Sequence, residues 1–98
     1  MFSHVVIWWT NPEVPNAEEL ILAGAEKYLR PIPFLKAYHI GRMATSHRPV
    51  VEQSYQVAMH VAFEDKAAQD VYQDHPLHLD FVRECKHAWS RVVIYDFE

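Results

Sequence analysis

The seven residues Tyr72-Gln73-Asp74-His75-Pro76-Leu77-His78 decide how the second half of this 98-residue chain folds. Pro76 has no backbone N–H, and its ring disfavours helical geometry at His75, so a helix that begins near Asp65 must end here. Proline is well tolerated in the first turn of a new helix, which Asp74 or His75 can cap. The stretch therefore predicts two helices separated by a break at Pro76.

His78 lies in the first turn of the second predicted helix, where unpaired N–H groups and the positive end of the helix dipole disfavour an imidazolium. A rotation of 100° per residue places four residues on its side of the helix: Phe81, Val82, Cys85 and Trp89. On the preceding helix, Tyr72 shares a face with Ala68, Val71 and His75. The sequence thus directs His78 and Tyr72 toward the interior, where a neutral imidazole is suited to act as a general base.

Composition restricts the class of protein. Ninety-eight residues, half of them hydrophobic and 13% aromatic, predict one folded domain over residues 1–98 rather than a disordered chain. A net charge of −4 without a run of Lys or Arg argues against nucleic acid as a partner. The single cysteine, Cys85, precludes an intrachain disulfide, and the longest apolar run, Val5 to Trp9, is too short to span a membrane. We expect a cytoplasmic protein that does not interact with membranes.

Hydrophobic periodicity predicts four strands, over His4–Trp9, Phe34–Arg42, Tyr55–Phe63 and Arg91–Phe97. A helix capped by Asn16, with Glu19 completing a capping box, is expected between the first two strands. A long loop, Met43 to Ser54, separates the second and third strands, and the second helix after Pro76 should run to about Trp89.

This order is β-α-β-β-α-β, an α+β ferredoxin-like arrangement with an antiparallel sheet and all helices on one face. Right-handed crossovers place the first and third strands at the centre of the sheet. The opposite face carries mostly apolar residues: Val5, Ile7, Trp9, Ala58, His60 and Ala62. Because no segment of the chain is left to cover that face, we expect a homodimer in which two sheets pair as a dimeric α+β barrel.

Several short patterns occur in a fixed order along the chain: His4 at the start of an apolar strand, Ile32-Pro33, Phe63-Glu64-Asp65, Tyr72-x-x-His75-Pro76-x-His78 and Val92-Val93-Ile94-Tyr95-Asp96. With them, the chain resembles the stress-responsive dimeric α+β barrel (Dabb) family over nearly its whole length. The resemblance implies a homodimer with a cavity between sheet and helices in each subunit. In the branch of olivetolic acid cyclase-like polyketide cyclases, the residues that match His78 and Tyr72 act as the acid/base and its assistant.

The predicted catalytic residues are therefore His78 and Tyr72, for cyclase- or isomerase-like proton transfer on a small apolar or aromatic ligand. The residues expected to line the cavity are His4, Val6, Trp8, Tyr28, Val57, Met59, His75, Phe81 and Trp89. Trp8 is large enough to fill part of that cavity. His75 and His78 have the spacing of a metal-binding pair, but no Cys or Glu completes a zinc motif, so we predict neither a metal nor a cofactor.

Two alternatives remain from the sequence. In the first, the protein is a non-catalytic, stress-related binding dimer whose interior His78 and Tyr72 are structural. In the second, a histidine serves as the axial ligand of a haem-binding, monooxygenase-like barrel.

Overall fold

The computed structural model describes residues 1–98 and has the predicted β-α-β-β-α-β order. Its elements are β1 (Phe2–Thr10), α1 (Ala17–Gly24), η1 (Ala25–Leu29), β2 (Ala37–Arg42), β3 (Val57–Phe63), α2 (Lys66–Asp74), α3 (Pro76–Cys85), η2 (Lys86–Ala88) and β4 (Trp89–Phe97).

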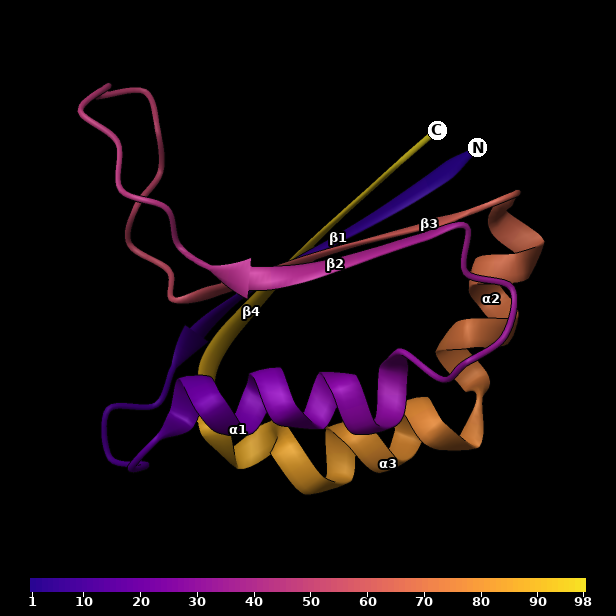
Figure 1. Cartoon of the computed structure of the whole chain (residues 1–98), viewed down its shortest axis with the longest axis horizontal. Helices are drawn as coiled ribbons and strands as arrows, with labels where there is room; N and C mark the ends of the chain where they lie inside the picture. The colour runs from indigo at the N-terminus through magenta and orange to yellow at the C-terminus, as the bar shows by residue number, and fades with distance from the viewer.

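The four strands form one antiparallel sheet in the order β2-β3-β1-β4, so the prediction that the first and third strands are central is confirmed. Figure 1 shows α1 and α3 lying together beneath the sheet, with α2 at one end and the two termini close together at the ends of β1 and β4. The helices thus cover one face of the sheet.

The hydrophobic core lies between the sheet and this helical layer. Alternate residues of β3 (Val57, Met59, Val61 and Phe63) point into it, as the period of two in the sequence predicts. Across the helices, a Cβ added to Gly24 of α1 would overlap the Sγ atom of Cys85 in α3. Glycine at this position therefore allows the two helices to approach closely.

The break at Pro76 is confirmed, and both helices beside it have side-chain caps. Asp65 accepts a hydrogen bond from the backbone N–H of Ala68 at 2.9 Å and caps α2. His75 accepts one from the backbone N–H of Leu77 at 3.1 Å through Nδ1 and caps α3, where Pro76 is the first residue. The first backbone N–H groups of a helix have no partner within the helix, and each cap supplies one. The caps therefore fix the start of α3 at Pro76, which places His78 in its first turn.

Two expectations about helix ends are wrong. Asn16 does not cap α1 with its side chain, because its backbone is left-handed (φ 57°) rather than extended as a capping residue requires. The second helix after Pro76 ends at Cys85 instead of continuing to Trp89, since Trp89 pairs with Thr10 and opens β4. The first helix continues into one π-helical turn, η1, in which Arg30 N–H bonds the carbonyl of Ala25 at 3.0 Å.

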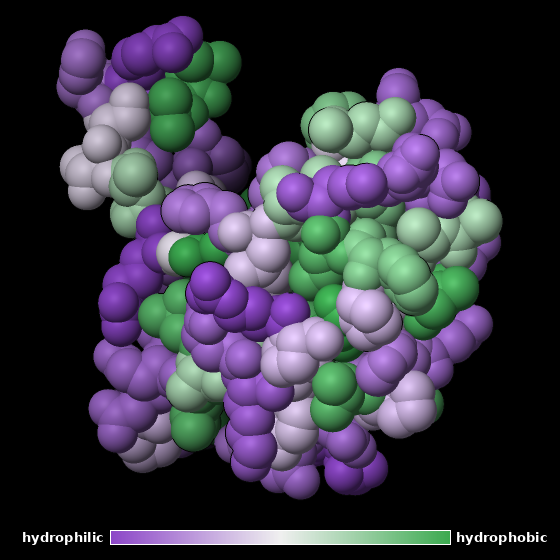
Figure 2. All heavy atoms as spheres, turned by 45° about the vertical axis from the view of Figure 1, so that its right-hand side comes forward, coloured by the Kyte–Doolittle hydropathy of each residue, from purple (hydrophilic) through white to green (hydrophobic).

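The loop from Met43 to Gln56 projects beyond the end of the sheet as an arm, visible at the upper left of Figures 1 and 2. Ser46 and Gln53 brace it, because the Gln53 amide both accepts from Ser46 N–H (2.9 Å) and donates to the Ser46 carbonyl (2.9 Å). Val50 on this arm is 77% exposed.

The sheet face opposite the helices remains open to solvent in the single chain. Val5, Ile7 and Trp9 on β1 are only partly buried, and Tyr95 and Phe97 on β4 are exposed. A contiguous apolar surface of this kind marks an interaction site in a folded protein.

None of the helices has the length and apolar character needed to cross a membrane.

Candidate functional site

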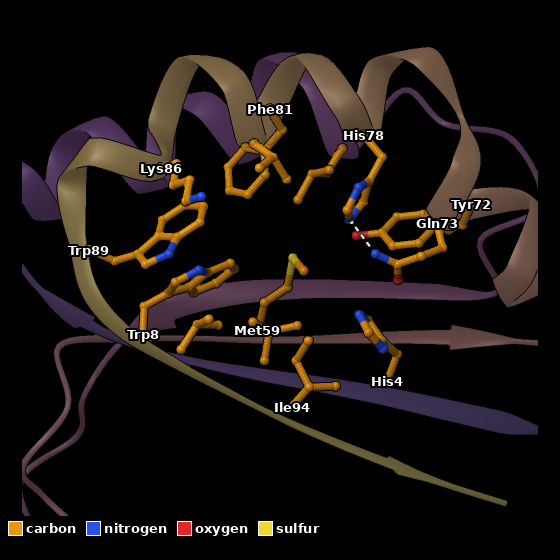
Figure 3. Close-up of a pocket in the computed structure, with 14 residues that line it drawn as sticks. His4, Trp8, Met59, Tyr72, Gln73, His78, Phe81, Lys86, Trp89 and Ile94 are labelled. Carbon is orange, nitrogen blue, oxygen red and sulfur yellow. Dashed lines mark hydrogen bonds between the residues drawn. The ribbon is translucent and has the colours of Figure 1, made fainter.

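A cavity of about 260 Å³ lies between the sheet and α3. Fourteen residues line it: His4, Val6, Trp8, Leu29, Met59, Tyr72, Gln73, His78, Phe81, Val82, Lys86, Trp89, Val92 and Ile94. Figure 3 shows that the polar side chains are unevenly distributed, with His4, Tyr72, Gln73 and His78 at one end and Lys86 at the other. An apolar cavity with a few grouped polar side chains is the usual form of a small-molecule site.

At the polar end, the Tyr72 ring lies between two imidazoles. Its centroid is 5.0 Å from that of His78 and 5.8 Å from that of His4, in edge-to-face arrangements. The Phe63 ring packs against the Tyr72 ring as well, with the centroids 5.1 Å apart. Tyr72 comes from the end of α2, His78 from the first turn of α3 and His4 from β1, so this end exists only in the folded chain.

Two polar atoms at this end are buried without a hydrogen-bond partner: the Tyr72 hydroxyl and the His78 Nδ1. Buried polar atoms in native proteins nearly always have partners, and exceptions call for an explanation. Tyr72 as a residue is only 1% exposed, so bulk water does not supply the missing bond. The hydroxyl has unused capacity to bind an oxygen atom of a ligand.

His78 is held neutral. Burial lowers its pKa, the positive charge of His4 when protonated lowers it further, and Asp74 opposes the change. Gln73 approaches the His78 Nε2 with its amide nitrogen at 3.4 Å, and the Gln73 oxygen accepts from Gln69 at 2.9 Å. With the Gln73 amide as donor, the lone pair of the neutral imidazole is on Nε2, and a substrate proton reaches it by displacing this long contact.

Tyr72 is also held in its neutral form. Burial raises its pKa, and the nearby Tyr38 raises it further. A phenol that does not ionise retains its O–H as a hydrogen-bond donor. Next to a neutral imidazole, it can stabilise negative charge that develops on a substrate oxygen.

His4 is oriented by Asp96, since His4 Nδ1 lies 2.6 Å from Asp96 Oδ1. Antiparallel pairing of β1 with β4 places the two residues directly opposite each other. A carboxylate bound to one imidazole nitrogen fixes the tautomer and the ring orientation. His4 is 2% exposed, so this partner also satisfies an otherwise buried polar group.

The other end of the cavity is aromatic. Trp8, Phe81 and Trp89 contact one another, with ring centroids about 6 Å apart in each pair. Phe81 and Trp89 are stacked at an interplanar angle of 28°. Trp8 forms one wall and leaves the cavity open.

Eight of the predicted site residues border this cavity: the two proposed catalytic residues, His78 and Tyr72, and His4, Val6, Trp8, Met59, Phe81 and Trp89. Tyr28, Val57 and His75 do not. In η1 it is the buried Leu29 that borders the cavity, whereas Tyr28 is partly buried against the core. Val57 is fully buried at the start of β3, and His75 is engaged in capping α3.

The sequence reasoning missed six lining residues: Leu29, Gln73, Val82, Lys86, Val92 and Ile94. A signal for two of them was present, because Val82 and Lys86 follow His78 at helical spacings of four and eight residues. Val92 and Ile94 lie opposite Trp8 and Val6 in the β1–β4 register, which no local pattern specifies. Cys85, which helical periodicity places on the same side as His78, is buried, and burial raises the pKa of its thiol.

Comparison with known proteins agrees with this fold. The model of the stress responsive A/B barrel domain (Dabb) family matches residues 2–98. A stress-response A/B barrel domain-containing protein of Arabidopsis thaliana is 27% identical over 96 residues, which cover 98% of this chain and 84% of that protein.

Two solved structures show the same architecture. A dimeric ferredoxin-like protein of unknown function from Thermobifida fusca has a TM-score of 0.78 and 23% identity, covering 98% of this chain and 88% of that one. A hydroxynitrile lyase from Passiflora edulis has a TM-score of 0.77 and 19% identity, covering 98% and 90%. At such identities the likeness concerns the fold.

Proposed function

Because the chain belongs to the stress-responsive A/B barrel domain family, we propose that it is a homodimeric enzyme that transfers protons on a small ligand in this cavity. His78 is the general base, and Tyr72 donates a hydrogen bond to the oxygen that becomes negatively charged. The dimer is supported by the open apolar face of the sheet and by the dimeric relative of the same fold.

One observation carries the proposal. The Tyr72 hydroxyl and the His78 ring meet at the same end of the cavity, where the hydroxyl is buried and has no partner (Figure 3). A purely structural tyrosine at this position would be expected to bond its neighbour or a backbone carbonyl. A ligand oxygen between the two groups would supply the missing partner.

The chemistry follows from the protonation states. Neutral His78 accepts a proton from a carbon next to a carbonyl group through Nε2, and the electron pair of the broken C–H bond moves onto the carbonyl oxygen. Tyr72 donates its hydrogen bond to that oxyanion while keeping its own proton. If the imidazolium returns the proton to another carbon of the enolate, the outcome is of isomerase type. In a cyclase-type outcome the enolate carbon attacks a second carbonyl of the same ligand, and the imidazolium protonates the alkoxide that forms. In a lyase-type outcome the enolate expels a leaving group from the next carbon, and the leaving group takes the proton.

The volume of the cavity favours a small substrate. A dry protein cavity of roughly 150 Å³ binds benzene, so by proportion about 260 Å³ accepts on the order of ten non-hydrogen atoms. Haem is several times larger, and the cavity gives the haem alternative no support. The hydroxynitrile lyase of the same fold is an example of a small-molecule lyase on this scaffold.

The experiment is hydrogen–deuterium exchange of phenylacetone in D₂O, followed by NMR. We expect the wild-type protein to accelerate exchange of the benzylic protons above the buffer rate. His78→Gln should reduce that acceleration by about 10²–10⁴-fold, and Tyr72→Phe should reduce it while the fold is retained. His87→Gln, which changes a histidine outside the cavity, should have no effect. Exchange equal in the wild type and in His78→Gln would refute a catalytic role and favour a non-catalytic binding dimer.

A further inference from the structure

Lys86 is the charged residue of the cavity lining, and it lies at the end away from His78 and Tyr72 (Figure 3). The other polar lining residues (His4, Tyr72, Gln73 and His78) lie at the opposite end, and His4 is already paired with Asp96. Lys86 takes part in no ion pair, whereas Lys36 and Lys66 pair with Glu64 and Asp70. A cation without a counter-ion at the edge of an apolar cavity is available to an anionic ligand.

The helix geometry explains why base and cation are at opposite ends. His78, Val82 and Lys86 follow one another at intervals of four residues, so they lie along one side of α3 and its extension η2. Eight residues at 1.5 Å per residue separate the backbones of His78 and Lys86 by about 12 Å. A ligand that contacts both side chains must therefore be elongated, with its two polar groups at opposite ends.

The middle of the cavity and its Lys86 end favour a ligand with a flat, apolar ring system. Trp8, Phe81 and Trp89 provide ring surfaces there, and Phe81 is stacked with Trp89. Aromatic ligands gain from offset-stacked or edge-to-face contacts with such rings. Lys86 itself is exposed, as are the lining residues Val92 and Ile94, so the attraction between Lys86 and an anion is that of a partly solvated pair.

We propose that the ligand is an arylalkyl carboxylate whose carboxylate pairs with Lys86, whose ring packs among Trp8, Phe81 and Trp89, and whose reacting carbonyl faces His78 and Tyr72. The last element rests on the proposed function, whereas carboxylate recognition by Lys86 does not. The net charge of −4 on the whole chain disfavours anions in general, so local recognition by Lys86 must supply the selectivity.

The test compares 3-phenylpropanoate with its uncharged isostere 3-phenylpropanamide by isothermal titration calorimetry at low salt. The wild-type protein should bind the carboxylate roughly five- to tenfold more tightly than the amide, as expected for a partly exposed, charge-assisted hydrogen bond. This preference should decrease at 0.5 M NaCl because salt screens the pair. Chemical shifts of the Trp8 and Trp89 indole N–H signals should change in the NMR titration.

Three variants make the test specific. Lys86→Met should bind the amide unchanged and lose the preference for the carboxylate, and Lys86→Arg should retain it. Lys27→Met is the matched control, because Lys27 is an exposed lysine outside the cavity, and it should behave as the wild type. Equal binding of acid and amide by the wild type would overturn the proposal. So would a preference that survives in Lys86→Met, or the absence of carboxylate binding at 10 mM.

Failure of this inference is distinguishable from failure of the proposed function. Carboxylate binding that depends on Lys86, together with no catalysed exchange of phenylacetone, would leave Lys86 as a recognition residue in a non-catalytic binding protein. Catalysed exchange that depends on His78, without discrimination between acid and amide, would leave the enzyme with a neutral substrate.

Discussion

Asp96 binds His4 across the β1–β4 pair, with Oδ1 2.6 Å from Nδ1, although 92 residues separate them in the chain. The His4 side chain is 3% exposed and that of Asp96 is 42% exposed. A partly exposed carboxylate of the edge strand β4 therefore holds a buried imidazole that lines the cavity.

Asp96→Ala should destabilise the protein, because it leaves the buried His4 imidazole without its partner. An unsatisfied buried polar group costs about 1–3 kcal/mol, which chemical denaturation can measure as a shift of the midpoint. The matched control is Asp70→Ala, which removes a carboxylate from an exposed pair with Lys66 and should change stability little. Equal effects of the two substitutions would show that the His4–Asp96 contact contributes nothing specific.

The loss of folding stability at mildly acidic pH should depend on His78. Burial lowers its pKa in the folded state, so between the unfolded-state value near 6.5 and the lower folded value the unfolded chain binds more protons. Stability is then fully present above pH 6.5 and decreases as the pH falls through that window. His78→Gln should make stability less dependent on pH there, as followed by urea denaturation at several pH values, while His87→Gln keeps the wild-type dependence. An NMR titration that places the His78 pKa above 7 would contradict the buried base.

The exposed sheet face should form the dimer interface. Sedimentation velocity at micromolar concentration should give a dimer for the wild type, with an interface of roughly 2,000 Å² or more in total, as in obligate homodimers. Ile7→Asp should yield monomer or insoluble protein, because dimerisation would bury an unpaired carboxylate. The control is Val71→Asp, which introduces the same charge at a 53% exposed position on α2 and should remain dimeric. A wild-type monomer would refute the interface.

Gly24 should be required for the contact between α1 and α3. Gly24→Ala brings a methyl group against Cys85 Sγ and should cost about 1–3 kcal/mol, as overpacking does, although alanine has the higher helix propensity. Because the clash is with one side chain, Cys85→Ala in the same chain should restore much of the loss. A double-mutant cycle by thermal or urea denaturation measures that coupling. Additive effects would show that the helices separate instead of clashing.

Local sequence signals were enough to predict several elements of this fold. Pro76 ends α2 because it lacks a backbone donor, and Asp65 and His75 cap the two helices on either side. The period of two in β3 and the order of strands and helices were sufficient for the ferredoxin-like fold and its central strands. The interior positions of His78 and Tyr72 followed from helical periodicity alone.

Tertiary structure decided what depends on pairing between distant segments. The register of β1 with β4 brings Asp96 to His4 and places Val92 and Ile94 at the cavity, and a register is set by the packing of the whole sheet rather than by either strand. Leu29 rather than Tyr28 borders the cavity, and α3 ends at Cys85 because Trp89 pairs with Thr10 in the sheet; neither outcome has a local sequence signal. The distance from Lys86 to His78 was implicit in their spacing, but only the folded cavity shows that both side chains face the same space.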